Sequence, residues 1–129
     1  MKFAQRVFLI AGVYGLLALL PMYFTEGKTG QDFPPAITHP EYYYGFIGVA
    51  VAWQVAFLIM ARDPVRYRLL MIPSVIEKFS FGIAVIVLFG FGRVNELILA
   101  AAVVDLVLGT LFAVAFVKTR EADDQNPER

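Results

Sequence analysis

Four long apolar stretches alternate with short polar ones along the chain. They cover residues 7–24, 44–61, 69–92 and 97–117. A helix needs about 20 apolar residues to cross the hydrocarbon core of a bilayer. The pattern therefore predicts an all-α membrane protein with four transmembrane helices. A polar tail over residues 118–129 follows the last span, and its composition predicts a solvated, disordered segment.

The composition also favours a lipid environment. Hydrophobic residues make up 59% of the 129 positions and charged residues 17%, whereas soluble domains have about 45–50% and about 25%. A soluble domain of this size has too much surface for its volume to bury so many apolar side chains. The net charge is zero, so no basic excess indicates a nucleic-acid partner. With no cysteine and one histidine, His39, we expect no metal site.

Basic residues are unevenly distributed between the two ends of the expected spans. Only Lys28 and Arg93 fall in the first and third connections. The other basic residues outside the spans are Lys2 and Arg6 at the N-terminus, Arg62, Arg66 and Arg68 in a basic link between the second and third spans, and Lys118, Arg120 and Arg129 in the tail. Lys and Arg concentrate in cytoplasmic loops. The distribution therefore predicts an up-down-up-down bundle with both termini cytoplasmic and segment 25–43 outside.

The start of the third helix has a local signal of its own. Asp63 followed by Pro64 is typical of a helix N-cap and first helical position. We therefore expect this helix to begin near Pro64, with Arg66 and Arg68 in its first turns. Pro73 then lies near the helix start, where proline is tolerated.

Polar side chains near the middle of the spans are the candidates for function. They are Tyr14, Gln54 with Trp53 beside it, Glu77, Lys78 and Asp105. A charged residue at a helix centre costs roughly 2.5–3.5 kcal/mol on insertion scales. Such residues therefore almost always face the bundle interior or a wet cavity. Asp105 shares a helical stripe with the small residues Ala101 and Gly109, which let helices approach closely.

Whether the charged groups pair directly depends on the register of the last two helices. Folding about the turn at 93–96 would place Asp105 level with Ala84. Lys78 would then lie about 9 Å away along the axis, at about 1.5 Å per residue. Glu77 and Lys78 are adjacent in sequence, and adjacent helical positions do not face each other. Water, another polar side chain or a second subunit would then complete the network.

Two interpretations of these polar residues stay open. In the first, they only fix the register of the helices, since interhelical polar contacts contribute about 0.6 kcal/mol on average. In the second, they form a ligand-binding site or a proton relay. We favour the second, because three ionisable groups are more than packing needs.

The segments RDPVRYR (62–68) and MIPSVIEK (71–78), followed by an apolar hairpin carrying Asp105, resemble small four-helix bacterial membrane proteins of the DoxX-like kind. The likeness covers roughly the last two-thirds of the chain. It implies a bacterial inner-membrane protein, and some relatives are linked to quinone-coupled sulfur oxidation or redox homeostasis. Thiol chemistry cannot be carried over, because the chain has no cysteine. The positions that the resemblance maps are Arg66, Glu77, Lys78 and Asp105.

Three functions are compatible with this pattern. The first is a polar-centred pocket for a lipophilic molecule such as a quinone or lipid, with the bilayer as its environment. The second is a proton-coupled small-molecule transporter acting as a homodimer, although small multidrug exporters carry their carboxylate in the first span and this span has none. The third is an accessory subunit of a membrane complex. No catalytic constellation can be named, which favours a non-enzymatic protein.

Overall fold

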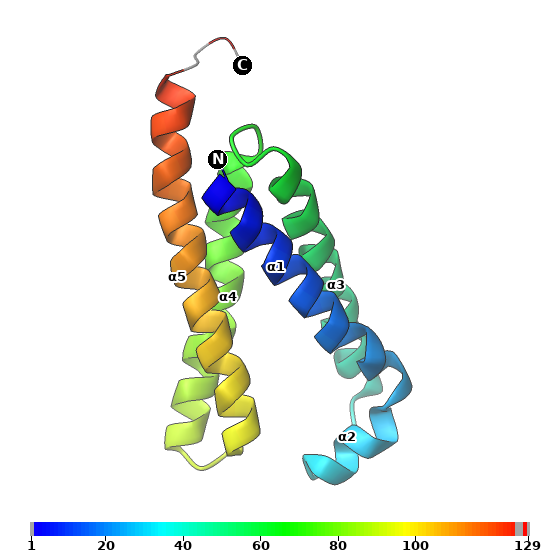
Figure 1. The fold of residues 1–129 in the computed structure, drawn as a ribbon. Helices are drawn as coiled ribbons and strands as arrows, with labels where there is room; N and C mark the ends of the chain where they lie inside the picture. The colour runs from blue at the N-terminus through cyan, green and yellow to red at the C-terminus, as the bar shows by residue number, and fades with distance from the viewer. Residues whose placement is uncertain (1, 126–127, 129) are drawn as a thin grey trace.

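The computed structural model describes residues 2–125 and 128, and this part of the chain is all-helical, with no strand. Figure 1 shows four long helices joined by short segments. The long helices are α1 (Lys2–Leu19), α3 (Pro40–Arg62), α4 (Met71–Gly90) and α5 (Glu96–Asp124). The short ones are η1 (Leu20–Phe24), which continues α1, α2 (Glu26–Asp32), and η2 (Arg68–Leu70), which leads into α4.

All four long helices are long and apolar enough to cross a membrane, which confirms the prediction of four membrane-spanning helices. Helices suit this environment because they satisfy their own backbone hydrogen bonds where no water is present. Their ends differ from the expected ones. Helix α1 begins at Lys2 and α3 begins at Pro40. Proline suits the first helical position because a backbone N–H there would have no acceptor within the helix.

The start of the C-terminal tail is also helical. Helix α5 continues to Asp124, so the expectation of disorder directly after the last span is wrong. Thr119 is fully buried, and its hydroxyl donates to a backbone oxygen one turn earlier at 2.7 Å. Lys118 places its ammonium 4.3 Å from the centre of the Phe3 ring. The burial of Thr119 and the contact of Lys118 with Phe3 hold the segment against the bundle. Residues 126, 127 and 129 of the tail lie outside the described part.

The long helices are arranged in two pairs. Helix α1 packs along α3, and α4 packs along α5, while α1 also contacts α5. Figure 1 shows the two pairs close together at the end where both chain termini lie and farther apart at the opposite end. The two pairs are therefore joined mainly at one end of the bundle.

The aromatic core lies where the two pairs meet. Phe8 of α1 stacks on Phe112 of α5 with ring centres 4.3 Å apart, and Phe57 of α3 meets Phe112 edge-on at 4.9 Å. All three side chains are fully buried, as are the neighbouring Met60 and Met71. This cluster joins one helix pair to the other.

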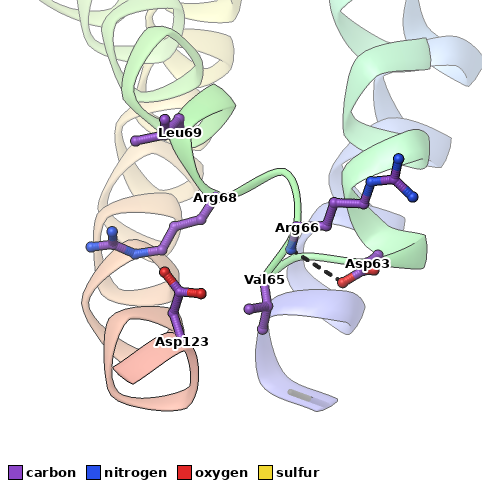
Figure 2. A pocket seen from close by; sticks show the side chains of 6 residues that line it. All are labelled: Asp63, Val65, Arg66, Arg68, Leu69 and Asp123. Atoms are coloured by element: carbon purple, nitrogen blue, oxygen red, sulfur yellow. Dashed lines mark hydrogen bonds between the residues drawn. The ribbon is translucent and has the colours of Figure 1, made fainter. Parts of the chain in front are cut away.

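The link between α3 and α4 differs from the expected helix start (Figure 2). Asp63 does cap this segment, since its Oδ1 accepts a hydrogen bond from the Arg66 backbone N–H at 3.2 Å. The chain then forms a turn and η2 before α4 begins at Met71 rather than near Pro64. Arg68 stabilises this path by donating from Nε to the Phe116 backbone oxygen at 3.0 Å.

Candidate ligand-binding cleft

A cavity of about 440 Å³ lies between the two helix pairs, and we call it the inter-pair cleft. Its volume is within the range of about 300–1,000 Å³ that is usual for small-molecule sites. All four long helices line it, in the half of the bundle away from the chain ends. Most of the lining is apolar, and its larger side chains are Tyr14, Leu19, Met22, Phe33, Phe46, Phe81, Leu97 and Ile98.

Three charged side chains meet at this cleft, and we call them the charged cluster: Glu77, Lys78 and Asp105. The Lys78 ammonium donates to Asp105 Oδ1 at 3.3 Å and lies 3.5 Å from Glu77 Oε2. It also lies 5.4 Å from the centre of the Phe57 ring. Lys78 is only 5% exposed. The sequence placed these groups in the bundle interior, and they do come together there.

The expected offset between Lys78 and Asp105 is wrong, because the register of α4 and α5 differs. A Cβ on Gly109 would lie 3.1 Å from the Lys78 Cβ, so these two positions are level. Asp105 is then one helical turn from Lys78, about 6 Å along the axis, which a lysine side chain can span. The expectation that Glu77 and Lys78 cannot meet is also wrong, since both side chains turn into the cleft.

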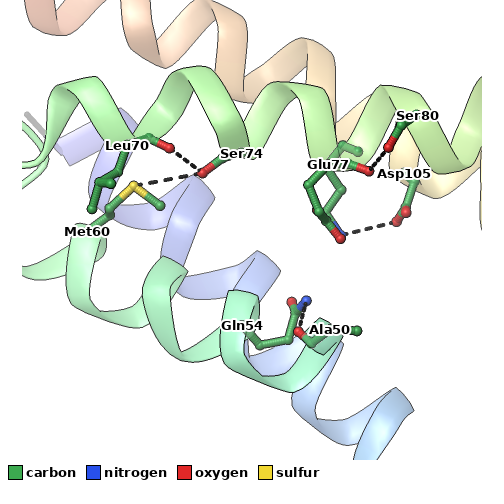
Figure 3. A network of polar contacts seen from close by, with 9 residues as sticks. Ala50, Gln54, Met60, Leu70, Ser74, Glu77, Ser80 and Asp105 are labelled. Carbon is green, nitrogen blue, oxygen red and sulfur yellow. Dashed lines mark hydrogen bonds and ion pairs between the residues drawn. The ribbon is translucent and has the colours of Figure 1, made fainter. Parts of the chain in front are cut away.

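Gln54 of α3 forms the opposite side of the cleft. Figure 3 shows its side chain pointing toward the side of Glu77 and Asp105. Gln54 is 2% exposed, and its Nε2 donates to the Ala50 backbone oxygen at 3.0 Å. Over the described residues no hydrogen-bond partner reaches Gln54 Oε1 or Glu77 Oε2. Two buried acceptors at this cleft are thus left without a donor.

Gly15 of α1 makes room for Gln54. A Cβ at Gly15 would collide with the Gln54 amide. Gly15 also lines the cleft. Phe46 and Phe81 line the cleft as well, but nothing in an apolar span distinguishes such residues from lipid-facing ones.

The remaining candidate residues of the site are divided between two hollows. Tyr14 lines the inter-pair cleft but stays 43% exposed. Trp53 lines a second hollow of about 340 Å³ between α3 and α4. Glu77 lines both hollows. Trp53 therefore lies apart from Gln54, although the two hollows adjoin through Phe46, Glu77 and Phe81.

The basic link lies far from the charged cluster along α4. Arg66 and Arg68 line a separate open hollow of about 720 Å³ beside Asp123, near the chain ends (Figure 2). The Arg68 guanidinium lies 3.8 Å from the centre of the Phe116 ring, and Arg62 is exposed outside this hollow. Arg66 does not join the charged cluster, and Arg68 is held against α5 by its contacts with Phe116.

No group of three potential metal ligands was found among the described residues. His39 and Glu41 form an exposed pair at 3.2 Å outside the cleft. The chain matches no family model, and neither a curated protein nor a solved structure matches it. The likeness to DoxX-like proteins stays a prediction, and the charged inter-pair cleft is the feature from which the function has to be argued.

Proposed function

We propose that this chain is a small integral membrane protein that binds a lipophilic molecule in the inter-pair cleft. The observation that carries this proposal is a cavity with apolar walls and a buried charged cluster, formed jointly by all four long helices. Quinones and lipids are the ligand classes that the sequence favours. The apolar body of the ligand lies between Phe46 and Phe81, and its polar end meets the charged cluster.

A purely structural role explains less of this arrangement. One ion pair, between Lys78 and Asp105, is enough to fix the register of α4 and α5. Glu77 and Gln54 add further buried polar atoms, two of which have no hydrogen-bond partner in the described chain. Leaving a buried acceptor without a donor costs about 1–3 kcal/mol. A bound ligand that supplies the missing contacts accounts for this cost.

Blocking the cleft tests the proposal. We expect Ala101→Phe to weaken binding by about tenfold or more, because a bulky ring at this lining position occupies the ligand volume. The control is Val103→Phe, which adds the same ring at a 50% exposed position of the same helix. Binding is measured in nanodiscs by titrating quinones and lysolipids while following the fluorescence of Trp53, the single tryptophan. Non-saturable binding to the unmodified protein would contradict the proposal.

The same proposal includes an orientation in the membrane. We place the four helices in up-down-up-down order across a bacterial inner membrane, with both termini cytoplasmic, on the basis of the uneven distribution of lysine and arginine. The cleft then lies in the outer half of the bilayer, since Thr29 and Phe33 of the outer segment line its far end.

Cysteine labelling tests this orientation without background, because the chain has no cysteine. Gly27→Cys places a thiol in open space near the start of α2, and Glu121→Cys places one on the exposed end of α5. We expect an impermeant maleimide to label Gly27→Cys in intact spheroplasts and Glu121→Cys only after permeabilisation. The reverse pattern would place both termini outside.

A further inference from the structure

The two buried atoms that lack a partner at the inter-pair cleft are of one chemical kind. Gln54 Oε1 and Glu77 Oε2 are both hydrogen-bond acceptors. The orientation of the Gln54 amide follows from its own contact, since Nε2 donates to the Ala50 oxygen and reversing the amide would bring two oxygens together. The missing partner is therefore a donor.

The protein's own cation, Lys78, makes one hydrogen bond at the cleft, to Asp105. The Lys78 ammonium has three N–H donors, and it lies against Asp105 Oδ1, Glu77 Oε2 and the face of Phe57. Its 3.5 Å separation from Glu77 Oε2 is not a hydrogen bond. Within the described residues, neither Glu77 Oε2 nor Gln54 Oε1 receives a hydrogen bond from Lys78.

The formal charges point the same way. With all three groups ionised, Glu77 and Asp105 carry two negative charges against one positive charge on Lys78. The single positive charge of Lys78 is thus shared between two carboxylates, and the cluster carries one excess negative charge. A bare charge within a membrane is costly, and such charges are normally compensated.

We propose that the ligand of the inter-pair cleft is a lipophilic amine in its protonated form, whose ammonium donates to Gln54 Oε1 and Glu77 Oε2. This inference rests on the proposed function and specifies the ligand class. The cation balances the excess negative charge of the cluster, and its N–H groups supply the missing donors. The apolar body lies against Phe46 and Phe81, whose rings also attract a cation. A quinone fits less well, because its carbonyl oxygens are acceptors that would face acceptors.

The test compares three probes that share one aromatic lipophilic body. The first is the primary amine, the second its neutral N-acetyl derivative, and the third its trimethylammonium analogue, which is charged but has no N–H donor. Binding of each to the full chain in nanodiscs of uncharged lipid is measured by calorimetry and corrected with empty nanodiscs. We expect the amine to bind saturably and about tenfold or more tighter than the N-acetyl derivative, since a charge-assisted hydrogen bond has about this effect. The trimethylammonium probe is expected to bind between the two.

Two variants locate the effect. Glu77→Gln keeps the size of the side chain and removes its charge, and we expect it to lower amine affinity about tenfold or more. The affinity for the N-acetyl derivative should change less than about twofold in this variant. Glu121→Gln makes the same chemical change at an exposed position of α5 away from the cleft and should leave both affinities unchanged. Gln54→Met, which removes the second acceptor, should also weaken the amine selectively.

Each outcome bears on the inference. Equal affinity of the unmodified protein for the amine and the N-acetyl derivative overturns it, and this comparison needs no variant to fold. Unchanged amine affinity in folded Glu77→Gln also overturns it. Saturable binding of a quinone or of the N-acetyl probe without a preference for the amine leaves the proposed function standing while the inference fails. If no lipophilic probe binds saturably, both fail.

Discussion

Replacing Lys78 by Met is expected to destabilise the folded protein by about 3–5 kcal/mol, because it leaves buried charge without a partner. Lys78 is the only described cation within salt-bridge distance of Glu77 and Asp105, at 3.5 and 3.3 Å. Met preserves most of the side-chain volume, so the loss of stability measures the removal of the charge and not a change in packing. Unfolding in mixed micelles, followed by circular dichroism, measures the change in the free energy of unfolding.

A double variant separates charge pairing from other effects. Lys78→Met combined with Asp105→Asn removes both members of the closer pair, and we expect it to recover at least half of the lost stability. Lys28→Met is the control, since its pair with Asp32 is exposed and should contribute less than about 1 kcal/mol. If Lys78→Met alone were as stable as the unmodified protein, Lys78 would not be the counter-ion of the cluster.

Phe112→Ala is expected to destabilise the protein by about 3–5 kcal/mol, the usual cost of removing a buried phenyl ring. Phe112 is fully buried and contacts both Phe8 and Phe57, so its loss leaves a cavity where the two helix pairs are joined. The same unfolding measurement checks this value.

The matched control for this change is Phe91→Ala. Phe91 is 76% exposed, so removing its ring should change the free energy of unfolding by less than about 0.5 kcal/mol. Equal effects of the two substitutions would show that Phe112 is not the residue that holds the helix pairs together. Amine binding in Phe112→Ala is informative as well, because a looser junction should weaken the inter-pair cleft.

The membrane helices could be predicted because their signal is local. The length of an apolar run and its lack of charge depend on adjacent residues, and they identified four spans that the structure confirms. The same local view failed at the tail. It gave no sign that Thr119 is buried or that Lys118 packs on Phe3, since these contacts join the two ends of the chain.

The charged cluster could be anticipated from composition, but its pairing could not. Lipid excludes Glu77, Lys78 and Asp105, which predicts that they turn inward. Their distances depend on the register of α4 against α5, and the close approach of Gly109 to Lys78 shows which positions are level. A small-residue stripe reveals that helices approach closely but not which residue lies opposite. The estimate of the offset was therefore too large.

The inter-pair cleft was the least predictable feature. The cleft exists because the two helix pairs move apart with increasing distance from the aromatic core. The sequence of one helix pair does not reveal the angle that it makes with the other pair. Trp53 and Gln54 are neighbours in sequence but line different hollows, since adjacent positions on a helix point in different directions.

The one-ended junction of the bundle has a mechanical consequence. The aromatic rings of Phe8, Phe57 and Phe112 join the two helix pairs, and the residues that line the cleft come from other turns of the same helices. A small change in the angle between the two helix pairs at these rings would displace their far ends by a larger distance. Because the two pairs are joined mainly at one end, we expect the width of the cleft at the other end to respond to the thickness of the surrounding bilayer.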